Sequence, residues 1–143
     1  MRWKHPNPFV FEHTVTEDEI DLLNHVNNKT YLAWMEKVAW QHSFSVGIDE
    51  ALIRELQRIM VIARHEMNFL RSCYLDEKLH IGTWVSKPDG VKKRYRYFQV
   101  IREKDQKTVF TAKSLWICID LSDYKSTAIP IEMIEPYQAQ YIN

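Results

Sequence analysis

The sequence has no excess of either charge and no long apolar run, and each absence argues against a class of function. Lysine plus arginine and aspartate plus glutamate both number 19, so the formal net charge is zero. A neutral chain has no global field to hold nucleic acid or an anionic membrane, although a local basic patch remains open. No apolar run approaches the roughly 18 residues that a membrane-spanning helix requires. We therefore expect no nucleic acid partner and no membrane span.

Cysteine is also scarce. The two cysteines, Cys73 and Cys118, lie far apart and lack the Cys-x-x-Cys or Cys/His spacing of a zinc site. We expect two reduced core thiols, no disulfide framework and no metal. The N-terminal residues, which include Pro6 and Pro8, lack the apolar segment of a signal peptide. A cytoplasmic protein is therefore expected.

What the sequence does contain is enough apolar material for one core. Of the 143 residues, 45% are hydrophobic and 13% aromatic, which predicts a single domain over residues 1–143. Apolar spacing of three to four residues predicts one long helix from Asn27 or Asn28 to about Val46, and a shorter helix is expected over 49–56. Branched and aromatic residues predict strands over 9–15, 58–69, 77–85, 91–102 and 108–121. Residues 130–143 are expected to form a final edge strand or a tail.

One long helix followed by a run of antiparallel strands indicates an α+β domain in which the sheet wraps the helix. The polar loop that feeds this helix is the stretch best suited to chemistry. It places a carboxylate, Asp21, and an imidazole, His25, just before Asn27 and Asn28, which are good helix N-cap residues. Unpaired N–H groups at a helix start attract negative charge. An acid or base and an anion-stabilising helix end therefore fall within one short segment.

The pattern D-x-x-x-H-V-N-N-x-x-Y-L-x-W-x-E of this segment resembles hotdog-fold thioesterases of the 4-hydroxybenzoyl-CoA thioesterase type, and also acyl-ACP thioesterases. The matching residues are Asp21, His25, Val26, Asn27, Asn28, Tyr31, Trp34 and Glu36. The resemblance continues through residues 65–71, 74–77, 112–120 and 129–130, so it covers nearly the whole chain. It implies a hotdog fold, in which a curved antiparallel sheet wraps one long central helix. It also implies a homodimer, or a dimer of dimers, with active sites at the subunit interface.

The resemblance also implies the roles of the loop residues. Asp21 would attack the thioester or activate the water that does, and backbone N–H groups near Asn27 and Asn28 would stabilise the oxyanion. His25 is expected to orient substrate or water, with a structural role as the alternative. Two departures weaken the parallel with acyl-ACP thioesterases, because Leu23 and Asn68 stand where that group has Asn and Glu.

Substrate contacts are expected from the helix and from two strands. Tyr31 and Trp34 could border the acyl pocket, although a helix tryptophan is more often a core residue. His65 and Asn68 lie on the strand that, in the family, runs beside the active-site loop across a dimer interface.

The basic run from Lys92 through Lys93 and Arg94 has two interpretations. It could bind the phosphates of coenzyme A or the acidic face of acyl carrier protein. Alternatively, it is the solvated face of an amphipathic strand, since alternating side chains point to opposite sides. Interleaved aromatic and basic residues also fit a platform for single-stranded nucleic acid. Net neutrality and the lack of a known RNA-binding motif argue against that interpretation.

The sequence therefore predicts an acyl-CoA thioesterase that needs no cofactor other than the CoA of its substrate. Three alternatives remain open: an acyl-ACP thioesterase, a non-catalytic protein that binds acyl thioesters, and a hotdog dehydratase. A dehydratase commonly pairs a strand histidine with an acidic residue on the helix. The Asp21-to-Tyr31 pattern favours the thioesterase.

Overall fold

The computed structural model describes residues 1–142, and its elements follow the order expected from the sequence. Five strands and two α-helices are joined by short 3-10 helices. The main elements are β1 (Phe9–Thr14), α1 (Asn28–Ser45), α2 (Glu50–Leu56), β2 (Arg58–Phe69), β3 (Lys78–Val85), β4 (Lys93–Arg102) and β5 (Lys107–Asp120). The 3-10 helices are η1 (Glu17–Glu19), η2 (Ile131–Met133) and η3 (Glu135–Gln140).

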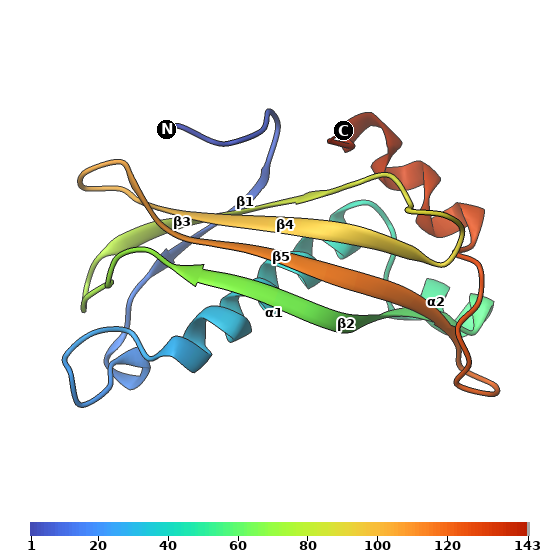
Figure 1. Ribbon diagram of the computed structural model, residues 1–143, viewed down its shortest axis with the longest axis horizontal. Helices are drawn as coiled ribbons and strands as arrows, with labels where there is room; N and C mark the ends of the chain where they lie inside the picture. Colours follow the sequence, from blue (N-terminus) through green and yellow to red (C-terminus); the bar gives the residue numbers. More distant parts are fainter. Residues whose placement is uncertain (143) are drawn as a thin grey trace.

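The five strands form one sheet in the order β1-β3-β4-β5-β2, and all neighbouring strands are antiparallel. Figure 1 shows α1 lying along one face of this sheet, with the loop before it at one end of the molecule and α2 at the other. The predicted α+β architecture, a curved antiparallel sheet around one long helix, is confirmed. β1 and β2 are the edge strands, so within residues 1–142 the outer edge of β2 has no partner strand.

Helix α1 begins and ends where the sequence predicts. The side-chain oxygen of Asn27 caps it by accepting a hydrogen bond from the Lys29 amide at 3.1 Å. At the other end, Gly47 adopts a φ of 87°, which a residue without a Cβ takes without strain. The buried face recurs every three to four residues, and its members are Tyr31, Trp34, Met35, Val38, Ala39, His42 and Ser43.

The face of the sheet that α1 covers holds the main core. Alternate strand residues point to it, as the period of two requires, and they include Leu79, Ile81, Phe98, Val100 and Ala112. Burial of such side chains contributes about 1.5–3 kcal/mol each. On each strand, the buried residues of this face therefore point toward α1, and their neighbours along the strand point away from it.

The N-terminal segment covers part of the opposite face. The Trp3 ring lies so close to Gly82 that a Cβ at this position would come within 2.6 Å of it. The indole N–H of Trp84 donates to the Pro6 carbonyl at 3.0 Å, and the Lys4 amide donates to Gln99 Oε1 at 2.9 Å. The sheet is thus buried on both sides near its centre.

The C-terminal residues form neither the edge strand nor the tail that was expected for 130–143. η2 and η3 replace the expected edge strand, because Pro130 and Pro136 lack the N–H that a ladder strand would donate. The single strand-like contact is an isolated parallel bridge between Ile142 and Ser86. Asn143, the last residue of the expected segment, lies outside the described residues. These turns instead close the end of the sheet near α2.

Three sequence expectations concern features that are absent. Cys73 and Cys118 are both buried and free, which confirms the expectation of two core thiols. Among residues 1–142, no three His, Cys, Asp or Glu side chains cluster in a way that could hold a metal ion. No helix in that same range has the length and apolar character needed to cross a membrane.

Candidate functional site

The loop before α1 is a closed turn that presents Asp21. An antiparallel bridge between Ile20 and Val26 pins its two ends. Inside the bridge, the Asp21 amide donates to the His25 carbonyl at 3.0 Å, and Asn24 takes a left-handed φ of 61°. Asparagine tolerates this conformation better than other non-glycine residues. The five residues from Asp21 to His25 are therefore held as one unit.

The Asp21 carboxylate and the His25 ring face each other within this unit. Asp21 Oδ1 accepts a hydrogen bond from the Leu23 amide at 2.9 Å and lies 3.8 Å from His25 Nδ1. His25 Nδ1 is also 3.2 Å from the Val26 carbonyl oxygen, which can only accept. Both side chains are about one quarter exposed. Asp21 Oδ2 accepts no hydrogen bond from residues 1–142, so it is free to meet substrate or water.

The helix start narrows the choice of oxyanion donor. Of the three candidate N–H groups, that of Val26 donates to the Cys73 carbonyl and that of Asn27 to the Glu19 carbonyl, each at 2.8 Å. The N–H of Asn28 donates to no acceptor in the described part of the chain. Asn28 is the first residue of α1, where the helix dipole favours negative charge. The Asn28 amide is therefore the donor left for a ligand oxygen.

Glu19 ties the loop to the core. Its Oε2 accepts the indole N–H of Trp34 at 2.8 Å, and its Oε1 lies 2.7 Å from His13 Nε2 and 2.9 Å from the Thr16 amide. Partial burial would raise the pKa of Glu19, but the hydrogen bonds from Thr16, His13 and Trp34 together lower it. Trp34 is 4% exposed. The structure thus places this predicted substrate contact in the core, where its N–H holds the residues that precede Asp21.

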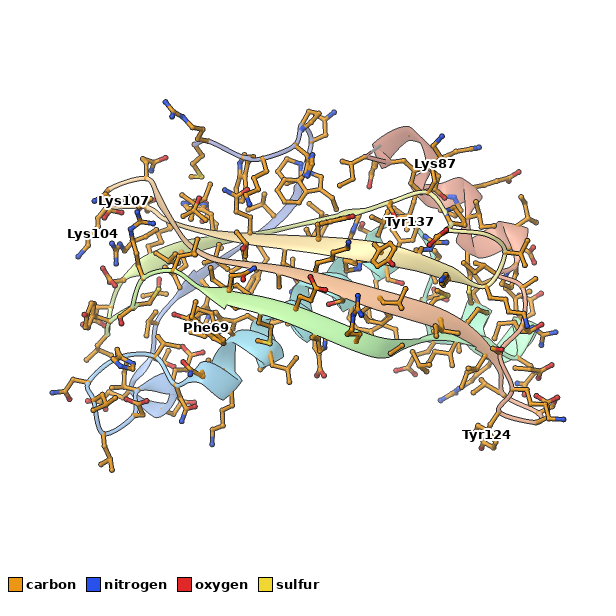
Figure 2. All side chains as sticks on the ribbon, in the orientation of Figure 1. Phe69, Lys87, Lys104, Lys107, Tyr124 and Tyr137 are labelled. Carbon is orange, nitrogen blue, oxygen red and sulfur yellow. The ribbon has the colours of Figure 1, made fainter. Side chains whose placement is uncertain are left out.

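Tyr31 is the second predicted pocket residue from α1, and it too is buried. Its ring stacks on Phe110 at a centroid distance of 4.8 Å and meets Phe69 edge-on at 5.3 Å. Burial, together with a hydrogen bond to Cys73, raises the pKa of the Tyr31 hydroxyl. Phe69 is 46% exposed at the end of β2, at the same end of the molecule as the Asp21 loop (Figure 2). Together these rings form an aromatic floor below that loop.

The sheet separates His65 from Asn68, two residues that were each expected to contact substrate. His65 lies opposite Ser114 and bonds its Oγ at 2.5 Å, on the face that α1 covers. Asn68 lies opposite Thr111 and donates to its Oγ1 at 3.2 Å, on the other face. Burial lowers the pKa of His65, while the charge of Glu36 on α1 opposes this shift. His65 on β2 therefore faces α1, the helix that carries Glu36.

The basic run on β4 is also divided. Arg94 points to the inner face and is 4% exposed, whereas Lys93 points to the outer face and lies 3.8 Å from Asp89. Lys92 is exposed in the preceding loop. The three residues do not form one surface. At about 3.3 Å per strand residue, Lys93 lies about 30 Å along β4 from Arg102, which is near the Asp21 end.

The fold and the loop together define a class of protein. The sheet order, the single long helix across its inner face and the acidic loop at the start of that helix are those of the hotdog fold that the sequence resemblance implied. Residues 15–136 match the family model of the thioesterase-like superfamily, and the chain belongs to this family. No curated protein sequence matches it.

Solved structures of similar fold support this class. A hypothetical protein from Staphylococcus aureus, solved in complex with CoA, is 18% identical; the match has a TM-score of 0.85 and covers 100% of this chain and 91% of that one. A 1,4-dihydroxy-2-naphthoyl-CoA thioesterase from Synechocystis is 13% identical, with a TM-score of 0.79 and coverage of 93% and 94%. The 12:0-ACP thioesterase from Umbellularia californica is 16% identical, with a TM-score of 0.84; the match covers 95% of this chain but about half, 51%, of that one. At these identities the likeness shows the shared fold, and the family match supports thioester hydrolysis as the general activity.

Proposed function

We propose that this protein hydrolyses acyl-CoA thioesters to a carboxylic acid and free CoA, with Asp21 as the general base or nucleophile. The observation that carries the proposal is that one short segment holds both a carboxylate oxygen of Asp21 and an Asn28 N–H at the start of α1 that bond to no group within residues 1–142. The CoA bound to the Staphylococcus aureus neighbour and the CoA thioester named for the Synechocystis enzyme support the choice of carrier.

The reaction follows from these two groups. The thioester carbonyl oxygen accepts the Asn28 N–H, and a water molecule held by Asp21 attacks the carbonyl carbon while Asp21 accepts its proton. The tetrahedral intermediate then collapses, the C–S bond breaks, and CoA leaves as a thiolate that regains a proton. In the covalent variant, Asp21 itself attacks and water cleaves the resulting anhydride. Either route produces one acid and one thiol per water consumed.

His25 takes a supporting role in this scheme. Its Nδ1 side faces Asp21 and the Val26 carbonyl, which orients the ring beside the carboxylate. The proposed reaction needs no metal or redox cofactor, because a thioester carbonyl is already electrophilic and a thiolate leaves readily.

We propose further that the active form is a homodimer, or a dimer of dimers, joined through β2. The outer edge of β2 has no partner strand within residues 1–142, and an unpaired edge is a template for another strand. In one protomer, Lys92 and Lys93 lie too far along the sheet to serve the Asp21 loop of the same chain. If they bind CoA phosphates, they do so for the site of another protomer.

Three alternatives make different demands on the residues of this site. An acyl-ACP substrate, as named for the Umbellularia californica enzyme, would use Asp21 in the same way but would dock a protein carrier. A dehydratase would instead rely on a strand histidine and a helix carboxylate, and in its favour His65 on β2 faces α1, the helix that carries Glu36. A non-catalytic binding protein would keep the pocket without using Asp21 as a base.

The deciding experiment measures thiol release from short, medium, long and aromatic acyl-CoAs. We expect Asp21→Asn to lower kcat by about 10²–10⁴-fold, the range that a positioned general base supplies. Asp123→Asn, in the exposed turn after β5, is the matched control and is expected to turn over like the wild type. Circular dichroism and size-exclusion chromatography of each variant check that fold and assembly are unchanged.

The arms of this experiment separate the alternatives. Full activity in a folded Asp21→Asn variant would refute the proposed role of Asp21. Turnover of acyl-ACP but not of acyl-CoA would identify the protein carrier. Hydration of an enoyl-CoA that depends on Glu36 and survives Asp21→Asn would replace hydrolysis by the dehydratase.

A further inference from the structure

A cavity lies at the other end of α1 from the Asp21 loop. It is enclosed by the C-terminal half of α1, the beginning of β2 and the 3-10 segment near the C-terminus, and the sheet forms its floor. Its apolar walls include Ala39, Ile48, Ile59, Met60 and Met133. Figure 2 places Tyr137, from η3, beside β4 and far from Phe69, which marks the opposite end.

The floor of this apolar cavity carries two buried arginines. Arg94 and Arg96 are only 4% and 6% exposed, and both line the cavity. Arg96 is well bonded, since Nη1 donates to His42 Nδ1 and to Thr83 Oγ1, and Nη2 donates to the Tyr137 hydroxyl. All of its partners are neutral groups.

Arg94 is bonded far less completely. Its Nη2 donates to the Met133 carbonyl at 2.6 Å, and its guanidinium lies 5.2 Å from the centre of the Tyr137 ring. Its Nε and Nη1 are buried without a hydrogen-bond partner among residues 1–142, and so is the indole Nε1 of Trp116, which is opposite Arg94 on β5. Three donors on neighbouring strands are therefore orphaned in the floor and wall of one cavity.

The charge of this region is also unbalanced. Within residues 1–142, neither Arg94 nor Arg96 forms an ion pair with an aspartate or glutamate, whereas Arg58 and Arg102 on the same sheet each have a carboxylate within 4 Å. A buried charge without a counterion is strongly unfavourable, and so is a buried donor without an acceptor. Because buried charges in proteins are normally paired, a bound anion would relieve this imbalance.

From these observations we infer that the cavity binds a small amphipathic carboxylate, whose anionic head meets Arg94 and the Trp116 N–H and whose apolar body lies against Ile59, Met60 and Met133. A guanidinium fork matches a carboxylate in two parallel hydrogen bonds, and the indole N–H supplies a third. The walls disfavour a fully hydrated inorganic anion, because they offer it little hydrogen bonding. The inference concerns binding and does not rest on thioester hydrolysis.

The carboxylate can come from two sources. One is a free acid, and the other is the far end of an acyl group that carries a second carboxylate. Trp40 and Ser43 line the cavity 12 to 15 residues beyond the start of α1, which at 1.5 Å per residue is about 20 Å from the Asn28 amide. An acyl group bound at Asp21 of the same chain must therefore be long to reach it.

The test follows binding by calorimetry and locates it by the indole ¹H–¹⁵N signals. Octanoate is expected to bind in a saturable manner and to shift the Trp116 signal. It should leave the Trp84 signal unchanged, since that N–H is bonded to Pro6 on the opposite face. Octanamide, which has the same shape without the charge, is expected to bind at least tenfold more weakly. Equal affinity for the two compounds, no binding of octanoate, or a shift confined to Trp34 near Asp21 would overturn the inference.

Three variants connect the binding to its donors. Arg94→Met is expected to weaken octanoate binding at least tenfold, Trp116→Phe to weaken it severalfold, and Arg54→Met on the exposed face of α2 to have no effect. Without ligand, Arg94→Met is also expected to raise the urea midpoint of unfolding, because it removes an uncompensated buried charge. Wild-type affinity in Arg94→Met and Trp116→Phe would refute the site.

The two sources are then distinguished in the Asp21→Asn background. If an ω-carboxyacyl-CoA shifts the Trp116 signal and octanoyl-CoA does not, the carboxylate belongs to a long substrate. If octanoate alone shifts it, the ligand is a free acid. Both outcomes support the site. Failure of hydrolysis in the parent protein would leave the octanoate measurement unaffected.

Discussion

The two ends of α1 treat their polar groups in opposite ways. At the N-terminal end, the Glu19 carboxylate receives hydrogen bonds from three other residues, and Asp21 Oδ2 and the Asn28 N–H have no hydrogen-bond partner within residues 1–142. At the C-terminal end, two guanidinium groups are buried in an apolar cavity with no carboxylate from residues 1–142 beside them. We propose the first end as the site of the reaction and the second as the binding site of an anion.

This difference makes separate predictions for the two ends. Changes at the N-terminal end should reduce turnover more than stability. Changes at the C-terminal end should alter stability and ligand binding without touching the reacting atoms.

After Asp21→Asn, the largest effect is expected for Asn28→Pro, which removes the proposed oxyanion donor and keeps the helix. Proline suits the first position of a helix, and Asn27 already has the extended backbone that a residue before proline requires, with φ of −63° and ψ of 137°. We expect kcat to fall about 10²–10³-fold, or about 3–4 kcal/mol, as for loss of one oxyanion donor.

Asn28→Ala is the matched control, because it changes the exposed side chain and retains the N–H. Steady-state kinetics of both variants and their thermal unfolding give the comparison. Equal kcat values in Asn28→Pro and Asn28→Ala would show that the Asn28 amide does not contact the reacting oxygen.

At the other end, the next largest effect is a pH dependence of stability centred on His42. Burial, together with the positive charge of Arg96, lowers the pKa of His42 to about 4. Since the pKa in the unfolded chain is about 6.5, the unfolded state binds more protons between these values. Stability from this group is therefore complete above about pH 6.5 and is lost as pH falls towards 4, by about 3 kcal/mol in total.

Urea unfolding of the wild type and His42→Gln between pH 4 and 7.5 measures this difference. The variant should lose less stability on acidification, and the gap between the two proteins should stay constant above pH 7. Parallel curves over the whole range would mean that His42 is protonated as readily in the folded protein as in the unfolded one.

A smaller effect is expected for Trp34→Phe, which cuts the tie between the core and the loop. It removes the hydrogen bond to Glu19, and a bond to a charged group contributes about 1.5–3 kcal/mol. We expect about 2 kcal/mol of destabilisation and a further loss of kcat, because the residues before Asp21 lose their anchor.

Trp84→Phe is the matched control on the opposite face, where the same substitution removes a bond to a neutral carbonyl. It is expected to cost about 1 kcal/mol and to leave kcat unchanged. Chemical denaturation and initial rates separate the two quantities. A kcat loss in Trp84→Phe equal to that in Trp34→Phe would assign the effect to general loosening.

The sequence predicts the N-terminal end well because its parts are contiguous. Asp21, His25, Asn27 and Asn28 fall within eight residues, and a loop followed by a capped helix can be recognised from residue types alone. Apolar spacing and residue types likewise predicted the bounds of α1, α2 and all five strands to within about two residues. It could not show which of the loop N–H groups are occupied, because their acceptors, Cys73 and Glu19, are supplied by the folded chain.

The C-terminal end could not be foreseen in this way. Its cavity joins α1, β2, β4, β5 and the η segments, which come together only in the folded sheet. The sequence could nevertheless have predicted the separation of His65 from Asn68. Residues three apart on a strand point to opposite faces of the sheet. Neighbours on a strand do the same, which separates Lys93 from Arg94.

The smallest effect on activity is expected from replacing exposed lysines that lie near either end of α1 but outside both proposed sites. These substitutions test whether the two ends of α1 bind parts of the same substrate. Lys92→Ala with Lys93→Ala removes the exposed charges at the cavity end, while Lys104→Ala with Lys107→Ala does so at the Asp21 end, where Figure 2 shows both lysines. Exposed charges contribute about 0–1 kcal/mol, so the Lys92 and Lys93 variant should keep its stability. The Lys104 and Lys107 variant should be less stable, because it also removes the 2.7 Å contact between Lys104 and the buried Glu77 carboxylate.

If CoA phosphates reach across a subunit interface, replacing Lys92 and Lys93 by alanine should raise KM for acyl-CoA about two- to fivefold at low salt and leave kcat unchanged. The rise in KM should be smaller at high salt. KM for an N-acetylcysteamine thioester, which has no nucleotide, should stay constant. A rise confined to the Lys104 and Lys107 pair would instead place the nucleotide on the protomer that supplies Asp21. The cavity end of α1 would then act independently of turnover.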